Sequence, residues 1–403
     1  MLKHIAAALL ILLCATMDLA AGPDPSDWNA VVAEARGQTV YWHAWGGDPR
    51  INDYIAWAGE ETKSTYGVTV KHVKIADTAA AVSRVLGEKA AGRDSGGAVD
   101  LIWINGENFA AMKANKLLFG PWAEQLPNWR YVDHAGNPAV KMDFTIATDG
   151  FEAPWGKAQL VFYYDSERLA DPPRTIPALV QWARENPGRF SYPQPPDFLG
   201  TTFLKQALYE LSDDLPVLLQ PPELSDFDTV TQPLWSFLDH LTPLLWRAGK
   251  AYPQNGSRLR QLMADGEIDL ALSFNPGEVS AAVANFELAA TVRSYILAGG
   301  TIGNTSFVAI PYNASAKAGA MVLANFLLSA QAQARMQDPL VWGSFTVLDI
   351  ARLPGPERAW FEHLTPDTGT LTPQQLGTPL PEPHPDWITR VEEQWQRRYG
   401  IAR

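Results

Sequence analysis

The fold is decided by the stretch Gln38-Thr39-Val40-Tyr41-Trp42-His43-Ala44-Trp45-Gly46-Gly47-Asp48, which reads as an apolar strand that ends in a polar loop. A helix is predicted over 50–66 and a second strand over 68–75. The same alternation of helix and strand continues through residues 78–118. This spacing indicates βαβ units, and therefore an α/β fold with mostly parallel sheets.

The middle of the chain indicates a second lobe. A strong strand predicted over 159–164 crosses into it. Helices are then predicted over 177–186, 201–212, 233–248 and 256–265, followed by a buried strand over 268–273. Strands over 292–297 and 307–311 return the chain, and a long helix over 317–337 precedes a proline-rich tail with a last helix over 387–399.

Composition limits the class of protein. The 403 residues are 46% hydrophobic and 19% charged, which is globular but too long for one compact core. Against 32 basic residues stand 44 acidic ones, a net charge of -12, so a nucleic-acid partner is not expected. The 15 tryptophans suit both cores and ligand-stacking walls.

The first residues predict export. Lys3 and His4 precede an apolar run over 5–13, and small residues follow at 20–22, which is the pattern of a cleavable secretory signal over 1–21. We therefore expect a periplasmic protein. The single cysteine, Cys14, would leave with the signal, so neither a disulfide nor a thiolate site is expected.

Several strings carry a family resemblance. They are Trp42-His43-Ala44-Trp45-Gly46-Gly47, the run Asp100 to Phe109, Ser273-Phe274-Asn275-Pro276, Gly299 to Asn304, and the helix Ala320 to Ser329 followed by Ala330-Gln331-Ala332-Gln333. The chain resembles the type II extracytoplasmic solute-binding proteins of ABC importers, and more narrowly the substrate-binding component of the YnjBCD-type importers.

That resemblance implies a two-lobed periplasmic-binding-protein-like fold with crossover strands. Lobe 1 would comprise 22–157 and 298–403, with the C-terminal helical tail, and lobe 2 would comprise 158–297. It also implies a monomer that binds a small solute and works with an inner-membrane permease and its ATPase. The resemblance does not identify the ligand, because relatives include binders of thiamine, polyamines, iron and sugars.

Ligands of such sheets lie beyond the carboxyl ends of strands, which directs attention to two loops of the first lobe. In the first, Trp45 either walls a pocket or packs, and Asp48 either pairs with a cationic group or caps the next helix. In the second, Asn105 and Asn108 are candidates for ligand hydrogen bonds. Glu107, between them, is explained by default as a first-turn residue that complements the helix dipole.

Further candidate ligand contacts lie beside the presumed hinge, in the second lobe and on the returning segment. Glu152 and Trp155 stand beside the presumed hinge, where Trp155 suits pocket and packing equally. Thr201 either grips a ligand at a helix start or is an ordinary N-cap. Asn275 follows a buried strand, and Asn304 either lines the cleft or forms a bend.

No catalytic or metal constellation emerges from the motifs. The seven histidines show no i, i+4 pair, and neither zinc nor another cofactor is predicted. Tryptophans and carboxylates near the candidate loops favour a cationic or heteroaromatic solute, thiamine-like or polyamine-like. The rivals are a secreted glycoside hydrolase or carbohydrate-binding protein, which would also use tryptophan platforms and acids, and a scaffold without transport function.

Overall fold

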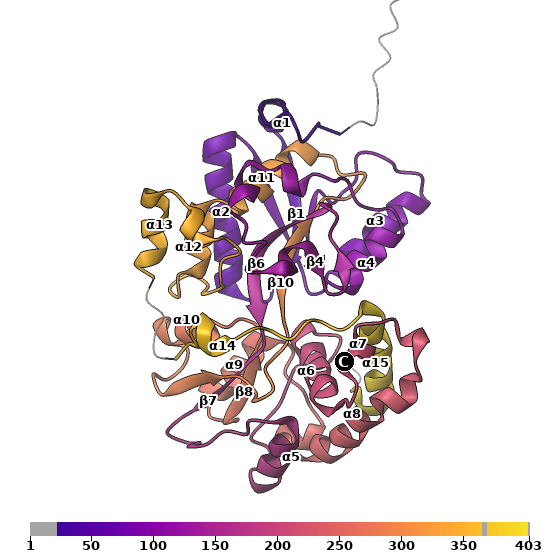
Figure 1. Ribbon diagram of the computed structural model, residues 1–403, viewed down its shortest axis with the longest axis vertical. Coiled ribbons are helices and arrows are strands. Elements are labelled where there is room, and N and C mark those ends of the chain that lie inside the picture. Colours follow the sequence, from indigo (N-terminus) through magenta and orange to yellow (C-terminus); the bar gives the residue numbers. More distant parts are fainter. Residues whose placement is uncertain (1–21, 365–368, 402–403) are drawn as a thin grey trace, which may run out of the picture.

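The computed structural model describes residues 22–364 and 369–401, which form two lobes stacked along the long axis of the molecule (Figure 1). The predicted signal sequence over 1–21, with Cys14, lies outside the described residues. Within the described ranges, no helix is long and apolar enough to span a membrane.

The first lobe is built on a sheet with the strand order β2-β1-β3-β10-β6. Strand β1 pairs in parallel with β2 and β3, whereas β10 runs antiparallel to both β3 and β6. A two-stranded hairpin, β4-β5, lies beside this sheet. The strands of this lobe are β1 (Thr39–Trp45), β2 (Thr69–Ile75), β3 (Leu101–Ile104), β4 (Met142–Asp143), β5 (Ile146–Ala147), β6 (Glu152–Gln159) and β10 (Gly303–Ala309).

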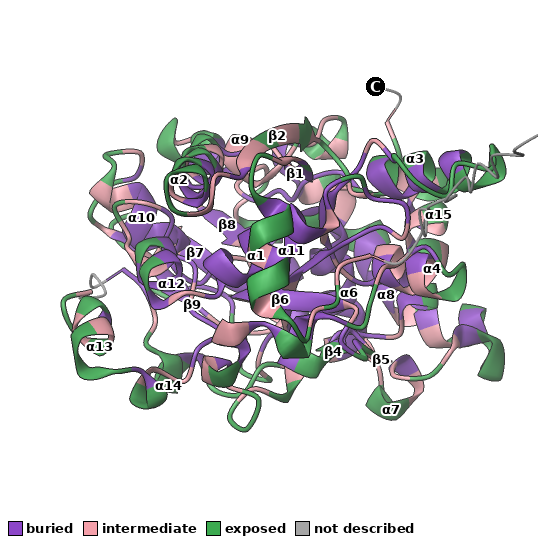
Figure 2. Cartoon of the chain, turned by 90° about the horizontal axis from the view of Figure 1, so that it is seen from above, coloured by how far each residue is buried: buried purple, intermediate pink, exposed green. Residues whose placement is uncertain are grey.

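Helices cover both faces of this sheet. One face carries a core shared with α1, α2 and α11, and the other a smaller core shared with α3 and α4. Seen from above, α11 and β6 are largely buried, and α1 lies outermost (Figure 2). The helices are α1 (Trp28–Ala35), α2 (Pro49–Tyr66), α3 (Ala79–Ala90), α4 (Glu107–Ala114), α11 (Lys317–Leu327), α12 (Ala330–Gln337) and α13 (Gly355–Glu362), with 3-10 turns at Ala123–Gln125, Pro127–Tyr131, Pro138–Lys141 and Ile350–Arg352.

The second lobe has a smaller sheet of order β8-β7-β9, in which both pairings of β7 are antiparallel. Its strands are β7 (Val161–Asp165), β8 (Leu270–Ser273) and β9 (Val292–Tyr295). Its helices are α5 (Ile176–Glu185), α6 (Phe198–Leu211), α7 (Leu215–Leu218), α8 (Phe227–Leu241), α9 (Gly256–Ala264) and α10 (Glu278–Ala284), with 3-10 turns at Pro222–Leu224, Thr242–Leu244 and Trp246–Gly249. The predicted two-lobed α/β class is confirmed, but the prediction of mostly parallel sheets is corrected. Only the pairings of β1 with β2 and β3 are parallel among the described strands, whereas the pairings of β10 and β7 are antiparallel because both strands follow crossings between the lobes.

The predicted crossover strand over 159–164 is two strands. β6 ends at Gln159 and β7 begins at Val161, so each strand belongs to a different lobe. Between them, the Leu160 N–H donates to the Ile302 carbonyl at 2.8 Å, which ties the outgoing segment to the returning one. The long helix predicted over 317–337 is likewise divided, because Ser329 caps a new helix, α12.

The C-terminal helix is placed differently from the prediction. We expected the tail within lobe 1, but α15 (Pro385–Tyr399) packs in the core of the second lobe through Trp387, Val391 and Trp395. In Figure 1 the yellow segment after α14 (Pro373–Leu376) crosses the molecule between the lobes to reach α15. Large aromatic residues drive this docking, because burying each removes much apolar surface from water.

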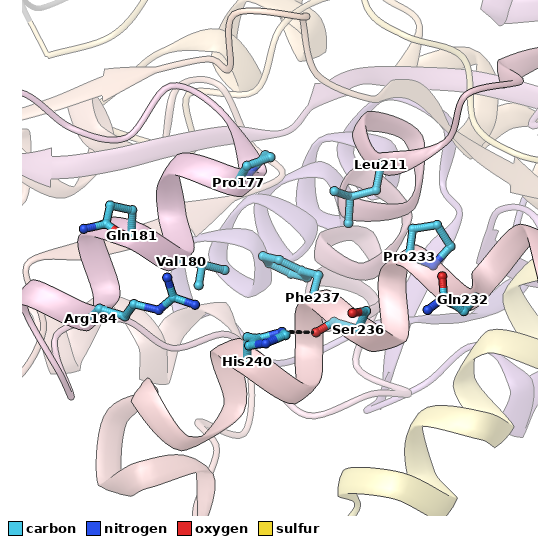
Figure 3. A pocket seen from close by; sticks show the side chains of 10 residues that line it. All are labelled: Pro177, Val180, Gln181, Arg184, Leu211, Gln232, Pro233, Ser236, Phe237 and His240. Carbon is cyan, nitrogen blue, oxygen red and sulfur yellow. Dashed lines mark hydrogen bonds between the residues drawn. The ribbon is translucent and has the colours of Figure 1, made fainter.

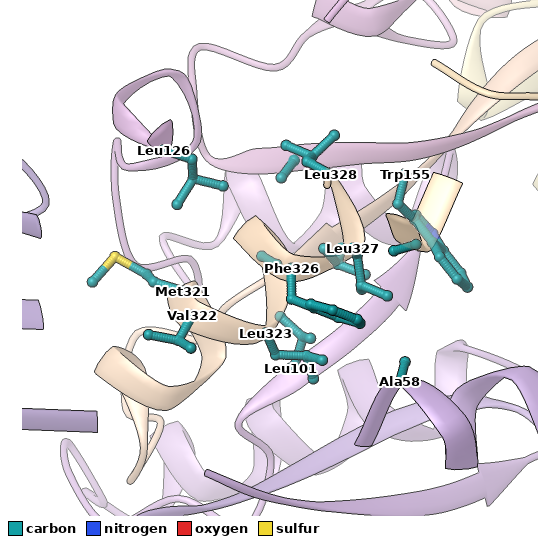
Figure 4. Close-up of a cluster of buried hydrophobic side chains, with 14 of the residues drawn as sticks. Ala58, Leu101, Leu126, Trp155, Met321, Val322, Leu323, Phe326, Leu327 and Leu328 are labelled. Carbon is teal, nitrogen blue, oxygen red and sulfur yellow. The ribbon is translucent and has the colours of Figure 1, made fainter. Parts of the chain in front are cut away.

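Trp155 lies at the centre of the first lobe's core and is fully buried. Its ring centroid is 5.3 Å from that of Trp42, 4.8 Å from that of Trp103 and 5.4 Å from that of Trp342. Figure 4 shows it beside the apolar side chains of α11. The prediction of Trp155 as a ligand contact is therefore corrected, because inward-facing positions of β6 pack against helices.

We predict that Trp155→Ala lowers the free energy of unfolding by about 3–5 kcal/mol, because it leaves a large cavity among packed rings. Urea unfolding followed by circular dichroism measures this change. Trp360→Ala, at a residue that is 46% exposed, is the matched control and should cost less than about 1 kcal/mol. Equal effects of the two substitutions would contradict the assignment of Trp155 to the core.

Candidate functional site

A group of carboxyl side chains from both lobes lies where the lobes meet, together with one lysine. We call Glu107, Asp143, Glu382 and Glu392, with Lys205, the acid cluster. Glu107 and Asp143 belong to the first lobe, Lys205 and Glu392 to helices of the second, and Glu382 to the segment that crosses between them. Helices α4 and α15, which carry Glu107 and Glu392, contact each other across the lobe boundary.

The first lobe's part of the acid cluster depends on the turn that joins β3 to α4. Gly106 adopts φ +59, and a Cβ at this position would lie 2.6 Å from the Phe144 ring, so both backbone and space require glycine. The Gly106 N–H donates to both carboxyl oxygens of Asp143, at 2.9 and 2.8 Å. Asn105 donates to the Thr305 carbonyl, and Asn108 donates to Glu107 at 2.8 Å.

The second lobe's part of the acid cluster lies on one face of α6. Phe198, Thr201 and Lys205 follow one another at spacings of three and four residues, so they share that face. Asp197 caps the helix through the Leu199 and Gly200 amides. Thr201 lies in the helix rather than at its cap, and its hydroxyl donates to Glu392 of α15.

The crossing segment supplies the partner of Lys205. The Lys205 ammonium lies 2.7 Å from one oxygen of Glu382, and the Asn304 side chain donates to the other oxygen at 2.8 Å. The side chains of this ion pair are only 3% and 1% exposed. Backbone hydrogen bonds from Leu380 to Thr301 and from Gly303, the first residue of β10, to Leu380 hold the segment in place.

Burial raises the pKa of every carboxyl group in the acid cluster. The pKa of Glu107 rises to about 7, mainly through burial and further through the nearby Glu392 carboxyl, while Lys205 opposes the rise. Burial likewise raises the pKa of Asp143 well above its usual range, and it raises the pKa values of Glu382 and Glu392. A cation that entered would stabilise the ionised forms of these groups.

An aromatic side chain stands at the edge of the acid cluster. Phe198 is 44% exposed although it begins a helix that is otherwise deeply buried. Its ring lies edge-on to that of Phe274, with the centroids 5.2 Å apart. A partly exposed ring beside carboxylates is suited to a cation or a flat heterocycle.

A second set of charges joins the lobes through α2, α9 and α10. We call Asp48, Arg50, Arg260 and Glu278 the interlobe ion network. Arg260 of the second lobe lies 3.3 Å from Asp48, and Arg50 of the first lies 3.2 Å from Glu278. Ser257 of α9 also donates to the Gly47 carbonyl at 3.1 Å and to Asp48 at 3.2 Å.

The two arginines of this network are shared among several acids, since Arg260 also lies 2.6 Å from Glu287. Burial alone would raise the pKa of Asp48, but the Arg50 and Arg260 guanidiniums outweigh it and lower that pKa. Asp48 also accepts from the Arg50 N–H as the N-cap of α2. Both alternatives considered for Asp48 therefore occur together, and the cation that it pairs with belongs to the protein.

Four of the predicted ligand contacts lie at the acid cluster, namely Asn105, Asn108, Thr201 and Asn304. Trp45 ends β1, half-buried, with its ring so close to Gly47 that a Cβ there would lie 2.3 Å away. Asn275 follows β8 as expected, but its side chain accepts from the Gly277 N–H and donates to the Trp342 carbonyl.

Glu152 does not lie beside the hinge. It begins β6, whereas the other end of that strand, Gln159, reaches the lobe boundary about 23 Å away at the usual rise of an extended strand. It is completely buried, and burial together with the Asp143 carboxyl raises its pKa well above the usual range. Its prediction as a floor residue of the cleft is corrected, because the crossover occurs at the far end of β6.

Sequence reasoning missed Phe198, Lys205, Asp143, Glu382 and Glu392. The spacing of Phe198, Thr201 and Lys205 along one helix face was a usable signal. Glu382 and Glu392 had no such signal, because the tail was assigned to the other lobe. Glu107, explained as a helix-dipole residue, is in the first turn of α4 and also part of the acid cluster.

A groove of about 530 Å³ lies elsewhere, between α5 and α8 of the second lobe (Figure 3). It is lined by Val180, Arg184, Phe237 and His240 among others, and none of the acid cluster lines it. In the ranges that the structure describes, no group of three or more histidine, cysteine or acidic side chains is arranged to hold a metal ion.

Known proteins are similar to this chain over most of its length. A family model described as bacterial extracellular solute-binding protein matches residues 56–356. Protein YnjB of Escherichia coli (strain K12) is 46% identical over 375 residues, which make up 93% of this chain and 94% of that protein.

Solved structures share the fold at low sequence identity. A putative spermidine/putrescine ABC transporter from Listeria monocytogenes superposes with a TM-score of 0.64 at 18% identity, over 91% of this chain and 99% of the other. The periplasmic binding protein AfuA from Actinobacillus pleuropneumoniae, with fructose-6-phosphate bound, also gives 0.64, at 13% identity and with the same coverages of 91% and 99%.

We predict that Asp48→Asn favours separation of the lobes. Asparagine still caps α2, but Arg260 loses its partner in the first lobe, and breaking a buried pair weakens the contact by about 3 kcal/mol. Small-angle scattering of the unliganded protein should show a larger radius of gyration than the wild type. Asp213→Asn, at an exposed loop residue, is the control; an unchanged radius for Asp48→Asn would contradict the role of the network.

Proposed function

Because this chain belongs to the family of bacterial extracellular solute-binding proteins, we propose that it captures a small cationic organic solute at the acid cluster. Substrate-binding proteins of ABC importers take up small solutes outside the cytoplasm and work with a permease and an ATPase. The cargo that we propose is of the thiamine or polyamine class. The solute would join the lobes through contacts to both, and the closed form would present it to the permease.

The observation that carries the proposal is the imbalance of charge. The acid cluster combines four carboxyl groups, of which those of Asp143 and Glu382 are buried, with the one ammonium of Lys205. Burial without full compensation disfavours their ionised forms, so a cation that supplied the missing charge would be attracted strongly. The exposed ring of Phe198 adds a surface for stacking or for cation–π contact.

The fold does not identify the solute, because the two solved structures named above are a putative spermidine/putrescine transporter and a binding protein with a sugar phosphate bound. An anionic sugar phosphate would meet the same carboxylates with unfavourable charge. The chemistry of the acid cluster therefore favours the polyamine class over the sugar phosphate, and it suits the cationic ring of thiamine equally well.

The direct test is a calorimetric screen of the mature protein against thiamine, putrescine, spermidine, choline, sugars and ferric salts. Binding of an organic cation with one-to-one stoichiometry supports the proposal. Binding confined to sugars, sugar phosphates or ferric ion overturns it, and release of reducing ends from an oligosaccharide would replace it with the hydrolase alternative.

We predict that Glu392→Gln weakens binding of the solute about tenfold or more, because a charge-assisted hydrogen bond contributes about 1.5–3 kcal/mol. Glu393→Gln is a matched control, since its neighbouring carboxylate on the same helix is 62% exposed. Calorimetry with the best ligand of the screen measures both. Equal affinities for the two variants would place the solute elsewhere.

We predict that binding releases a proton near neutral pH. A cation favours ionised Glu107, whose pKa of about 7 in the free protein must fall on binding. Affinity should therefore rise as the pH rises toward 7, by at most about tenfold per pH unit for one linked proton, and level off above it. Titrations in two buffers of different ionisation enthalpy count the protons. Glu107→Gln should remove this pH dependence. If the pH dependence of affinity persisted in this variant, Glu107 would not be its source.

A further inference from the structure

The Lys205 ammonium is held as a protein would hold the cation of a ligand. It contacts Glu382 at 2.7 Å, and it lies 4.7 Å from the ring centroid of Phe144 and 4.9 Å from that of Phe198. A carboxylate combined with aromatic faces is a recurring arrangement for ammonium groups. Phe144 comes from the first lobe and Phe198 from the second, so this lysine reaches across the boundary to occupy a place between them.

Both oxygens of the carboxylate in this arrangement are already engaged. Glu382 accepts from Lys205 through one oxygen and from Asn304 through the other. A second ammonium arriving here would face the charge of Lys205 at close range, where low exposure to water weakens screening.

The rest of the acid cluster is held by neutral donors. Glu107 accepts from the amide of Asn108 and Glu392 from the hydroxyl of Thr201. These bonds orient the two carboxyl groups without neutralising them. Lys205 acts on both groups through its charge, yet their pKa values remain raised, so a second positive charge beside them would be stabilised.

We infer that Lys205 is a specificity-determining residue that occupies one of two cation positions in the site, so that the solute brings a single cationic centre to the other. This inference rests on the proposed function and narrows it. The transported class is then a monocation, such as a thiamine-like quaternary ring or a monoamine, and a linear diamine is rejected by repulsion from Lys205.

The test uses putrescine and N-acetylputrescine, which share one carbon chain but carry two and one ammonium groups, with thiamine as a larger monocation. Calorimetry should show that the wild type binds the best monocation at least tenfold more tightly than putrescine. Lys205→Met keeps a chain of similar length but frees Glu382. This variant should shift the ratio of putrescine to N-acetylputrescine affinity toward putrescine by tenfold or more.

A control variant and a second measurement keep the result interpretable. The double variant K205M/E382Q removes both charges, so its ratio should lie between those of the wild type and Lys205→Met. If Lys205→Met is too unstable for calorimetry, the readout is its melting temperature, which putrescine should raise more than N-acetylputrescine does.

The outcomes separate the two claims. An unchanged ratio in Lys205→Met, or a wild type that binds putrescine as tightly as every monocation, overturns the role of Lys205 and leaves the proposed function standing. Failure of the wild type and Lys205→Met to bind any of the three cations overturns the proposed function and the inference together.

Discussion

The lobe boundary depends on carboxyl groups that are partly or fully removed from water where the two lobes meet. An ionised carboxylate in such a place is unfavourable unless a cation or several donors compensate it. Glu382 contacts Lys205 and Asn304 directly, whereas Glu107 and Glu392 accept from neutral donors and feel Lys205 only through its charge. The raised pKa of Glu107 follows from this incomplete compensation, and the proposed selectivity for positive charge and the proposed coupling of binding to protons rest on it.

The two charged regions of the lobe boundary differ in kind. In the interlobe ion network, two arginines and two acids share partners across the boundary, and Arg260 also pairs with Glu287. These charges compensate one another without any solute. In the acid cluster, four carboxyl groups accompany one ammonium, so their ionised forms are only partly compensated. Under the proposed function, the first region favours contact between the lobes in the unliganded protein, and the second favours it once a cation has bound.

Much of the architecture could be predicted from local pattern, because alternating strands and helices such as 38–75 specify their own packing. The loops carrying Asn105 and Asn108 were found for the same reason, since they end a buried strand. Trp155 and Glu152 were misplaced because the exact point of crossover, between Gln159 and Val161, is a property of tertiary pairing. The tail brings Glu382 and Glu392 to Lys205 by crossing to the second lobe. No local sequence pattern specifies that route.

The route of the tail affects the order in which the two lobes can fold. The core of the second lobe is begun by Leu160 and finished by Trp395, so its interior stays open until nearly the whole chain is available. Contacts between residues so distant in sequence form late, since a long loop must close before they contribute. The core of the first lobe, by contrast, receives its last buried side chain at Phe361. A chain emerging from its amino end can therefore complete the first lobe before the second, which must wait, together with the acid cluster, for the final helix.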